Sequence, residues 1–202
     1  MIEAAITAET EERVAALLRD GTEDAAIAAA REACAAMDRA GPQGAKRALA
    51  CGPGCSSCCH VHVEATGPEL MAIAAFIREA LTDEAQRALK DALDRTLQRV
   101  ADLDDEARWE ARIPCALLDP SGLCAIHPVR PLRCRAFHSL DAAACRAAFE
   151  GRDEAEPPRD RLLDRAQDAV EEGYDRALGA AGIPTHGARL EAALGRLLLD
   201  RD

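Results

Sequence analysis

The stretch Cys51-Gly-Pro-Gly-Cys55-Ser-Ser-Cys58-Cys59 places four cysteines within nine residues of a 202-residue chain. Two glycines, a proline and two serines stand between these cysteines, where a helix would need helix-forming residues. The stretch is therefore predicted to be a turn-rich loop. The short interval between Cys55 and Cys58 lets two sulfur atoms converge on one metal ion without the closure of a long loop.

Further cysteines follow the loop, and eight of the nine cysteines fall between residues 51 and 145. The candidate metal ligands are Cys51, Cys55, Cys58, Cys59, Cys115, Cys124, Cys134 and Cys145. Because Cys58 and Cys59 are adjacent, they cannot easily chelate one ion as a simple pair. The set could serve two four-ligand ions, or one cluster and one ion. We expect one or two centres of zinc or iron, since thiolates suit zinc and iron–sulfur clusters alike.

The remaining donor residues are weaker candidates. Four histidines lie beside the cysteines in the sequence, namely His60, His62, His127 and His138. A neutral ring nitrogen could bind metal, but each of the four is expected to support the ligands or to lie at the surface. His186 is expected at the surface as well. Cys34 stands alone in an alanine-rich segment and is expected to be a small buried side chain. Cys145 fits either a ligand or a core position.

Basic residues gather near the last cysteines. The segment from His127 to His138 holds Arg130, Arg133 and Arg135 and no acidic residue, in a chain whose net charge is −11. We expect these arginines to offset thiolate charge and to donate hydrogen bonds to sulfur.

The composition favours closely packed helices and excludes several partners. Apolar residues make up 49% of the chain, yet it holds only three Phe, one Trp and one Tyr. A β-sandwich prefers aromatic and β-branched residues, so a mainly α fold is predicted. The acidic charge balance argues against nucleic acid and against an anionic membrane surface. The acidic N-terminus and the shortness of the apolar runs indicate neither a signal peptide nor a membrane span. We expect a cytoplasmic protein, in which reduced thiols bind metal rather than form disulfides.

The pattern along the chain predicts a helical domain with a small β-hairpin and turn-rich cysteine loops around a metal site. Helices are expected over residues 10–19, 22–40, 67–80, 82–108, 140–150, 159–178 and 186–199. The hairpin is expected between residues 113 and 127, with Asp119-Pro-Ser-Gly122 as its turn and with Cys115 and Cys124 on its arms. Residues 1–202 are expected to form one domain. It would comprise N-terminal helices (1–50), a cysteine-cluster core (51–150) and C-terminal helices (151–202).

The order of these motifs resembles the CxxCxxCC, or YkgJ-like, cysteine-cluster family. The resemblance rests on Cys55-Ser-Ser-Cys58-Cys59, Cys115-Ala-Leu-Leu, Gly122-Leu-Cys124-Ala-Ile126 and Arg130-Pro-Leu-Arg-Cys134-Arg-Ala-Phe137. It runs from about residue 51 to residue 145 and implies that the domain chelates zinc or iron. A related cysteine-rich domain occurs in flagellin lysine N-methylases. In the family pattern the first cysteine stands three positions before the second, whereas Cys51 stands four positions before Cys55.

Three functions are compatible with the sequence. The first is a metal-binding protein, in which the ions hold the fold or are carried or sensed. The second is an enzyme in which an iron–sulfur cluster or an open metal acts on a protein side chain, although no glycine-rich loop indicates a nucleotide cofactor. The third is a helical interaction module with structural zinc only, which would meet another protein. A redox dithiol at Cys55 and Cys58 lacks the strand–helix context of thioredoxins. The sequence defines neither the substrate nor the oligomeric state.

Overall fold

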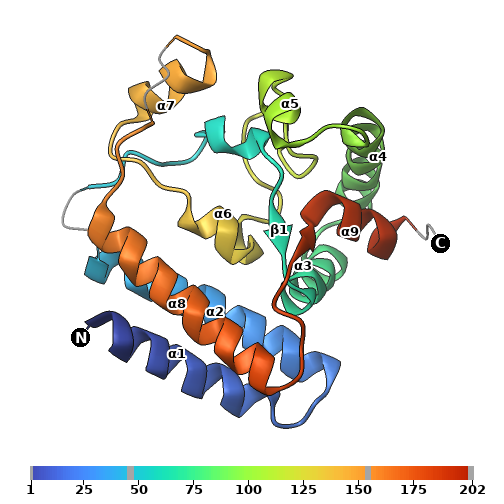
Figure 1. Cartoon of the computed structure of the whole chain (residues 1–202). Coiled ribbons are helices and arrows are strands. Elements are labelled where there is room, and N and C mark those ends of the chain that lie inside the picture. The colour runs from blue at the N-terminus through green and yellow to red at the C-terminus, as the bar shows by residue number, and fades with distance from the viewer. Residues whose placement is uncertain (1, 45–47, 153–155, 200–202) are drawn as a thin grey trace.

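The computed structural model of the protein describes residues 2–44, 48–152 and 156–199, and these residues are mainly helical, as predicted. The α-helices are α1 (Ile2–Leu18), α2 (Glu23–Gly44), α3 (Gly67–Ala80), α4 (Asp83–Val100), α5 (Asp105–Glu110), α6 (Leu132–Ala136), α7 (Ala142–Phe149), α8 (Arg161–Ala180) and α9 (Leu190–Leu198). Two 3-10 helices, η1 (Ser57–His60) and η2 (His127–Val129), and two strands, β1 (Glu64–Ala65) and β2 (Ala188–Arg189), complete the described elements. Figure 1 shows their arrangement.

Helices α1, α2 and α8 pack together although α8 lies far from the other two in the sequence (Figure 1). Their shared core includes Val14, Ala33 and Val170, none of which is exposed to solvent. Gly173 on α8 permits close contact with α1, because a Cβ atom there would lie 2.8 Å from Cβ of Thr10. Small residues thus bring these helices together, as the alanine-rich composition suggested.

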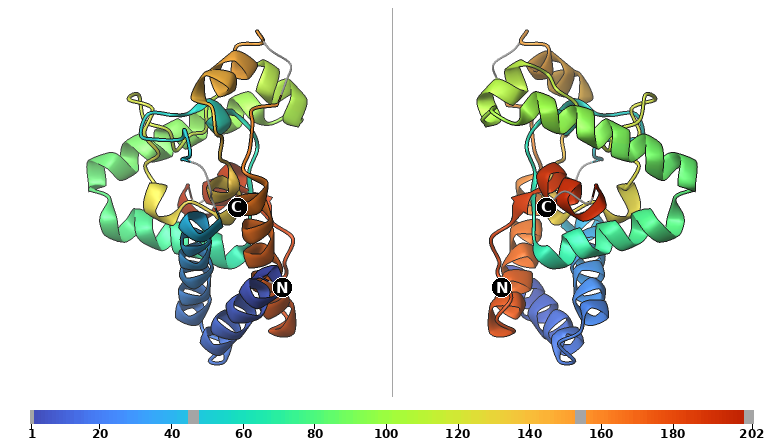
Figure 2. Two further views of the ribbon diagram at one scale, coloured as in Figure 1. Left: turned by 90° about the vertical axis from the view of Figure 1, so that its left-hand side faces the viewer. Right: turned by 90° about the vertical axis from the view of Figure 1, so that its right-hand side faces the viewer.

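A second core joins helices α3, α4 and α9 to the segment that carries two of the cysteines. Ile73, Leu93, Leu117 and Leu194 are buried at its centre. Cys115 and Cys124 are packed against the same cluster. The second core therefore forms one wall of the cysteine region. Figure 2 shows α3, α4 and α9 on the same side of the molecule.

Helix α3 has the predicted limits, 67 to 80, and begins at a capping box. The carboxylate of Glu69 accepts hydrogen bonds from both the backbone N–H and the hydroxyl group of Thr66, each at 2.8 Å. This reciprocal pattern satisfies N–H groups that the first turn of a helix leaves free. The local sequence signal was sufficient here because the capping partners are only three residues apart.

Strands β1 and β2 form a two-stranded antiparallel sheet in which Glu64 pairs with Arg189 and Ala65 with Ala188. The N–H of Leu190 also donates to the carbonyl of Val63, at 2.8 Å. This pairing attaches the start of α9 to the chain that leaves η1. It also explains why α9 begins at Leu190, although a helix was expected from residue 186.

The predicted β-hairpin between residues 113 and 127 is reduced to one isolated antiparallel bridge, between Leu118 and Cys124. The turn itself is present, since Gly122 has φ of +82° and the Asp119 carboxylate accepts from the N–H groups of Ser121 and Leu123. Because backbone hydrogen bonds from Cys115 and His127 are made within local turns or to other segments, the arms cannot continue as strands.

Further helix limits differ from the prediction. Helix α1 begins at Ile2, although a helix was expected only from residue 10. The helix expected over 82–108 ends at Val100, because Asp104 caps a separate helix, α5, by accepting from the N–H of Ala107 at 2.8 Å. Helix α7 is capped by Asp141 rather than begun from Ser139. The backbone of α2 continues to Gly44, beyond the expected end at 40. None of the described helices is long and apolar enough to cross a membrane. The division into segments 1–50, 51–150 and 151–202 stays a prediction.

Candidate metal centre

A cavity of about 670 Å³ lies between the cysteine loop, the 113–127 segment and α6. Seven of the candidate cysteines line it, namely Cys51, Cys55, Cys58, Cys59, Cys115, Cys124 and Cys134. They come from three stretches of chain: α3, α4 and α5 lie between the first and the second, and η2 lies between the second and the third. Folding therefore brings the thiols predicted from sequence to the walls of one cavity.

The first stretch is the loop that precedes η1, together with η1 itself. The backbone N–H of Cys55 donates to the carbonyl of Gly52 at 3.0 Å, and that of Cys59 donates to Ser56 at 2.9 Å. Gly54 adopts φ of +81°, a conformation that favours glycine. This predicted turn-rich loop is confirmed, and it carries Cys51 and Cys55 on one edge of the cavity.

The second stretch is attached to the first through the backbone. The N–H of Cys115 donates to the carbonyl of Cys59 at 2.7 Å, which fixes these two cysteines side by side. The carbonyl of Cys124 accepts from the N–H of His127 at 3.1 Å, and the bridge to Leu118 holds the other side of Cys124. Both cysteines are therefore held by paired backbone.

The third stretch is the short helix α6, which carries Cys134. The N–H of Leu132, at the start of this helix, donates to the buried carboxylate of Glu69 at 2.8 Å. The carbonyl of Arg135 accepts from the side chain of Gln167 at 3.3 Å. Helices α3 and α8 thus position α6, although it has only five residues.

Burial favours the neutral form of the thiols on the second and third stretches. It raises the pKa of Cys134 to about 12, and the charges of Cys124 and Cys58 add to this effect. Burial likewise raises the pKa of Cys115 and of Cys124. The pKa of Cys58 is raised by its hydrogen bond to the Cys59 sulfur and then by burial. A metal ion that bound here would have to displace protons, because the thiolate is the ligand.

Of the three arginines predicted to face the thiols, only Arg130 lines the cavity. Within the described residues, its buried Nε has no hydrogen-bond partner. Its charge lowers the pKa of Cys58, Cys124 and Cys134, in opposition to burial. The other two are engaged elsewhere: Arg135 pairs with Asp38, and a guanidinium nitrogen of Arg133 lies 3.6 Å from Glu171.

The eighth candidate, Cys145, lies on α7 and does not line the cavity. Cys145 is nonetheless close enough to Cys51 for its charge to raise the pKa of the Cys51 thiol. Burial of Cys51 is the main cause of that raised pKa. Helix α7 packs against η1, where the ring of His60 lies 4.4 Å from that of Phe149. Cys34 is buried in the core of α1, α2 and α8, as expected, and its thiol donates to the carbonyl of Arg130 at 3.7 Å.

The histidines take separate roles. His127 lines the cavity, whereas His62 contacts the buried Arg108 at 2.9 Å. His138 is buried, and its Nε2 accepts from the N–H of Asp160 at 3.1 Å. His186 lines a different cavity.

Sequence reasoning missed the part of the wall that α9 supplies. Glu191 lines the thiol cavity, accepts from the N–H of Ala116 at 2.8 Å and pairs with Arg108. Glu191 and Ala116 are 75 residues apart in the sequence, and no motif surrounds Glu191. Apolar side chains, including Val63 and Leu190, occupy the wall beside it. Only the fold could reveal this contribution.

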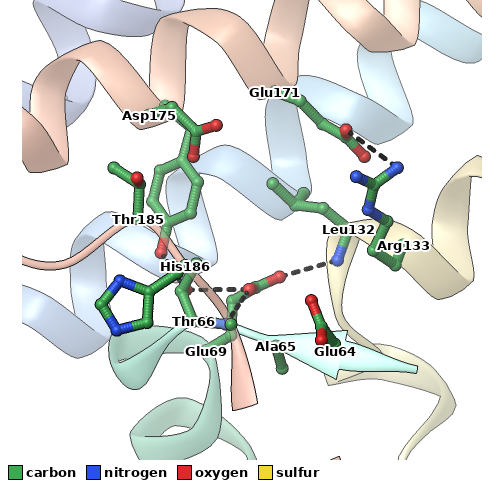
Figure 3. A pocket seen from close by; sticks show the side chains of 12 residues that line it. Glu64, Ala65, Thr66, Glu69, Leu132, Arg133, Glu171, Asp175, Thr185 and His186 are labelled. Atoms are coloured by element: carbon green, nitrogen blue, oxygen red, sulfur yellow. Dashed lines mark hydrogen bonds and ion pairs between the residues drawn. The ribbon is translucent and has the colours of Figure 1, made fainter. Parts of the chain in front are cut away.

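A second, smaller cavity of about 240 Å³ is lined by Glu69 and by residues of α8 and of the segment before β2 (Figure 3). Glu171 and Asp175 reach it from α8, and His186 reaches it from the segment before β2. Burial raises the pKa of both carboxyl groups. Figure 3 shows that the Glu69 carboxylate bonds to Thr66 and to the backbone of α6, so its oxygens serve the fold.

The donor set of the larger cavity fits a zinc or iron centre in its chemistry, because thiols are the donors that such centres use. The geometry is open. Within the described parts of the chain, no three His, Cys, Asp or Glu side chains are grouped closely enough to hold a metal ion. Binding would therefore require the sulfur atoms to converge.

The fold and the cavity define a mainly helical protein with a thiol-rich cavity. Residues 50–156, more than half of the chain, match the CxxCxxCC family, described as a zinc- or iron-chelating domain. The chain belongs to this family. The match confirms the resemblance seen in the motifs, and it assigns neither individual ligands nor a reaction. No curated protein and no solved structure gave a match.

Proposed function

We propose that the protein binds zinc or iron in the thiol-lined cavity, in one or two centres. The ligands would be drawn from Cys51, Cys55, Cys58, Cys59, Cys115, Cys124 and Cys134, with Cys145 as an eighth candidate. Such a site requires reduced thiols, which agrees with a cytoplasmic location.

The observation that carries this proposal is that seven cysteines, from three separate stretches of chain, line one cavity. Core packing alone would bury single cysteines, as it does for Cys34. The buried Nε of Arg130, which has no hydrogen-bond partner among the described residues, supports the same conclusion, because a guanidinium beside the thiols can offset thiolate charge.

Anaerobic purification, elemental analysis and an absorption spectrum test the proposal. We expect bound zinc or iron at about one or two ions per chain. Zinc gives a colourless protein, whereas an iron–sulfur cluster gives broad visible absorption with acid-labile sulfide. Protein that binds neither metal, even after reduction and addition of each, contradicts the proposal.

Replacement of one central thiol tests the location of the site. Cys58→Ser should lower the metal content and the melting temperature, because metal binding is coupled to the fold. Cys34→Ser is the matched control, since Cys34 lies outside the cavity. Equal metal content in both variants would contradict a ligand role for Cys58.

An enzyme with an open metal is a second candidate, and the size and lining of the cavity favour it. Its volume of about 670 Å³ lies within the range typical of small-molecule sites, roughly 300–1,000 Å³. Apolar Val63 and Leu190 and the carboxylate of Glu191 stand beside the thiols. Azide added to Co²⁺-loaded protein should change its visible spectrum if a coordination position is open. An unchanged spectrum would support a closed, structural centre.

A further inference from the structure

The thiols of the cavity differ in exposure. Cys51, Cys55 and Cys58 are exposed to solvent, whereas Cys59, Cys115, Cys124 and Cys134 are partly buried. All of these side chains line the same cavity, so no wall separates the exposed group from the buried group. A metal ion that arrives from solvent meets the exposed thiols first.

The same groups differ in how firmly the backbone holds them. We call Cys51 and Cys55 the entry thiols, because they lie on a loop outside regular structure whose described backbone bonds are few. We call Cys115, Cys124 and Cys134 the anchored thiols. Pairing with η1, the bridge to Leu118 and helix α6 hold these three in place.

Cys58 and Cys59 connect the two groups. The Cys58 thiol hydrogen-bonds the Cys59 sulfur, and the backbone of Cys59 is bonded to that of Cys115. The charge of Cys58 acts on both Cys51 and Cys134, so a thiol from each group lies near Cys58. Because no three donors are grouped closely in the described structure, some must move for binding to occur. The loop that holds the entry thiols lies outside regular secondary structure, so it can move without breaking a helix or a strand.

We propose that a metal ion is captured by the entry thiols and then passed, through Cys58 and Cys59, to the anchored thiols. Each step would exchange one ligand. An anchored thiol would lose its proton to solvent as its sulfur bonds to the metal. The bond from the metal to an entry sulfur would then break, and that sulfur would take up a proton from solvent. The oxidation state of the metal does not change. Anchored sulfurs hold the ion more tightly because less conformational freedom is lost when they bind it. This inference rests on the proposed metal-binding function.

Rapid mixing of the reduced, full-length chain with Co²⁺ tests the route, since cobalt thiolates absorb visible light. The wild-type chain should bind in two phases. The rate of the first should rise with Co²⁺ concentration, and the rate of the second should not. Cys55→Ser should slow the first phase several-fold, because it removes one of the two entry thiols. Cys124→Ser should keep the first phase and lose the second, and Cys34→Ser should change neither.

Timed alkylation of the wild-type chain gives a second measurement that needs no variant. At early times after Co²⁺ addition, Cys51 and Cys55 should be protected from iodoacetamide relative to the metal-free chain. At late times they should become reactive again, while Cys115, Cys124 and Cys134 become protected. Mass spectrometry of the peptides reads each site separately.

The failure of this route is distinct from failure of the proposed function. A wild-type chain that does not bind Co²⁺, zinc or iron contradicts metal binding itself. Binding in one phase, an unchanged first phase in Cys55→Ser, or simultaneous protection of all seven thiols would leave metal binding intact and overturn the route.

Discussion

Arg130 is the charged residue whose position most directly concerns the thiols. Its guanidinium lines the cavity, and its charge lowers the pKa of Cys58, Cys124 and Cys134. A metal centre made from several thiolates would be anionic, and Arg130 would stabilise it. We therefore expect Arg130→Gln to weaken zinc binding by about tenfold, as is typical for the loss of a group that supports metal ligands. Competition with a chromophoric chelator measures the affinity.

Arg133→Gln is the matched control for this change. It removes the same charge from the same segment, but Arg133 is exposed and lies beside Glu171. Its zinc affinity should stay close to that of the wild-type chain, because exposed charges are screened by solvent. Equal losses in the two variants would show that net charge alone matters and that the position of Arg130 does not.

The raised pKa of Cys134 predicts how the metal-free chain responds to pH. In the folded chain the pKa is about 12, against an ordinary value of 9.0. Between these values the unfolded chain has lost this proton and the folded chain has kept it. The free energy of unfolding should therefore fall as pH rises above about 9, by at most about 1.4 kcal/mol per pH unit from this group.

Urea unfolding of the reduced, metal-free chain at increasing pH measures this effect. Cys134→Ala should show a shallower fall, because the variant lacks the group that titrates. The same slope in both proteins would place the pH dependence elsewhere, for example at Cys115, whose pKa burial also raises.

At the scale of the elements, the contact between α1 and α8 depends on the absence of a side chain at Gly173. An added Cβ would lie 2.8 Å from Cβ of Thr10, closer than packed carbon atoms can approach. Gly173→Ala should therefore lower the free energy of unfolding by about 1–3 kcal/mol, the usual cost of overpacking. Chemical denaturation measures this change.

Gly179, on the same helix, provides the control. A Cβ there would meet no atom within 4 Å. Gly179→Ala should therefore be neutral or raise stability by up to about 1 kcal/mol, because alanine favours helix. A destabilisation of equal size in both variants would contradict the assigned role of the α1–α8 contact.

The elements also show which features the sequence could predict. Helix α3 was predictable because its cap, Thr66, and the partner, Glu69, are neighbours in the chain. The cysteine loop was predictable because its glycines, proline and short spacings are equally local. The two-residue strands could not be foreseen, because such strands have no alternating pattern to detect and their partners lie more than 120 residues apart. The end of α4 could have been foreseen from Asp104, which has the side chain of a helix cap.

The candidate site was likewise predictable only where its signals are local in the sequence. Eight cysteines were named as candidate ligands from spacing and motif order. Seven of them line one cavity, and Cys145 lies on α7 outside its lining. The contribution of Glu191 and the choice of Arg130 over its neighbours depend on tertiary packing. Spacing alone carries no information about which side chain of a basic segment turns inward.

At the scale of the whole molecule, the two hydrophobic cores should respond differently to loss of metal. Helices α1, α2 and α8 share one core, to which Leu132 of α6 also belongs, whereas Cys115 and Cys124 pack against the other core of α3, α4 and α9 (Figures 1 and 2). Beyond the sheet of β1 and β2 and the bridge to Leu118, the described cysteine segments lack strand pairing. Bound metal would add cross-links where such pairing is scarce.

Removal of the metal with a chelator should therefore increase amide hydrogen exchange in residues 48–60 and 113–136 far more than in α1, α2 and α8. Mass spectrometry of the exchanged chain locates the effect. Cys58→Ser should exchange rapidly in the cysteine segments with or without chelator, since it lacks a proposed ligand. A uniform increase over both cores would contradict the local effect, because it would mean that the metal controls the stability of the helical bundle as strongly as that of its own site.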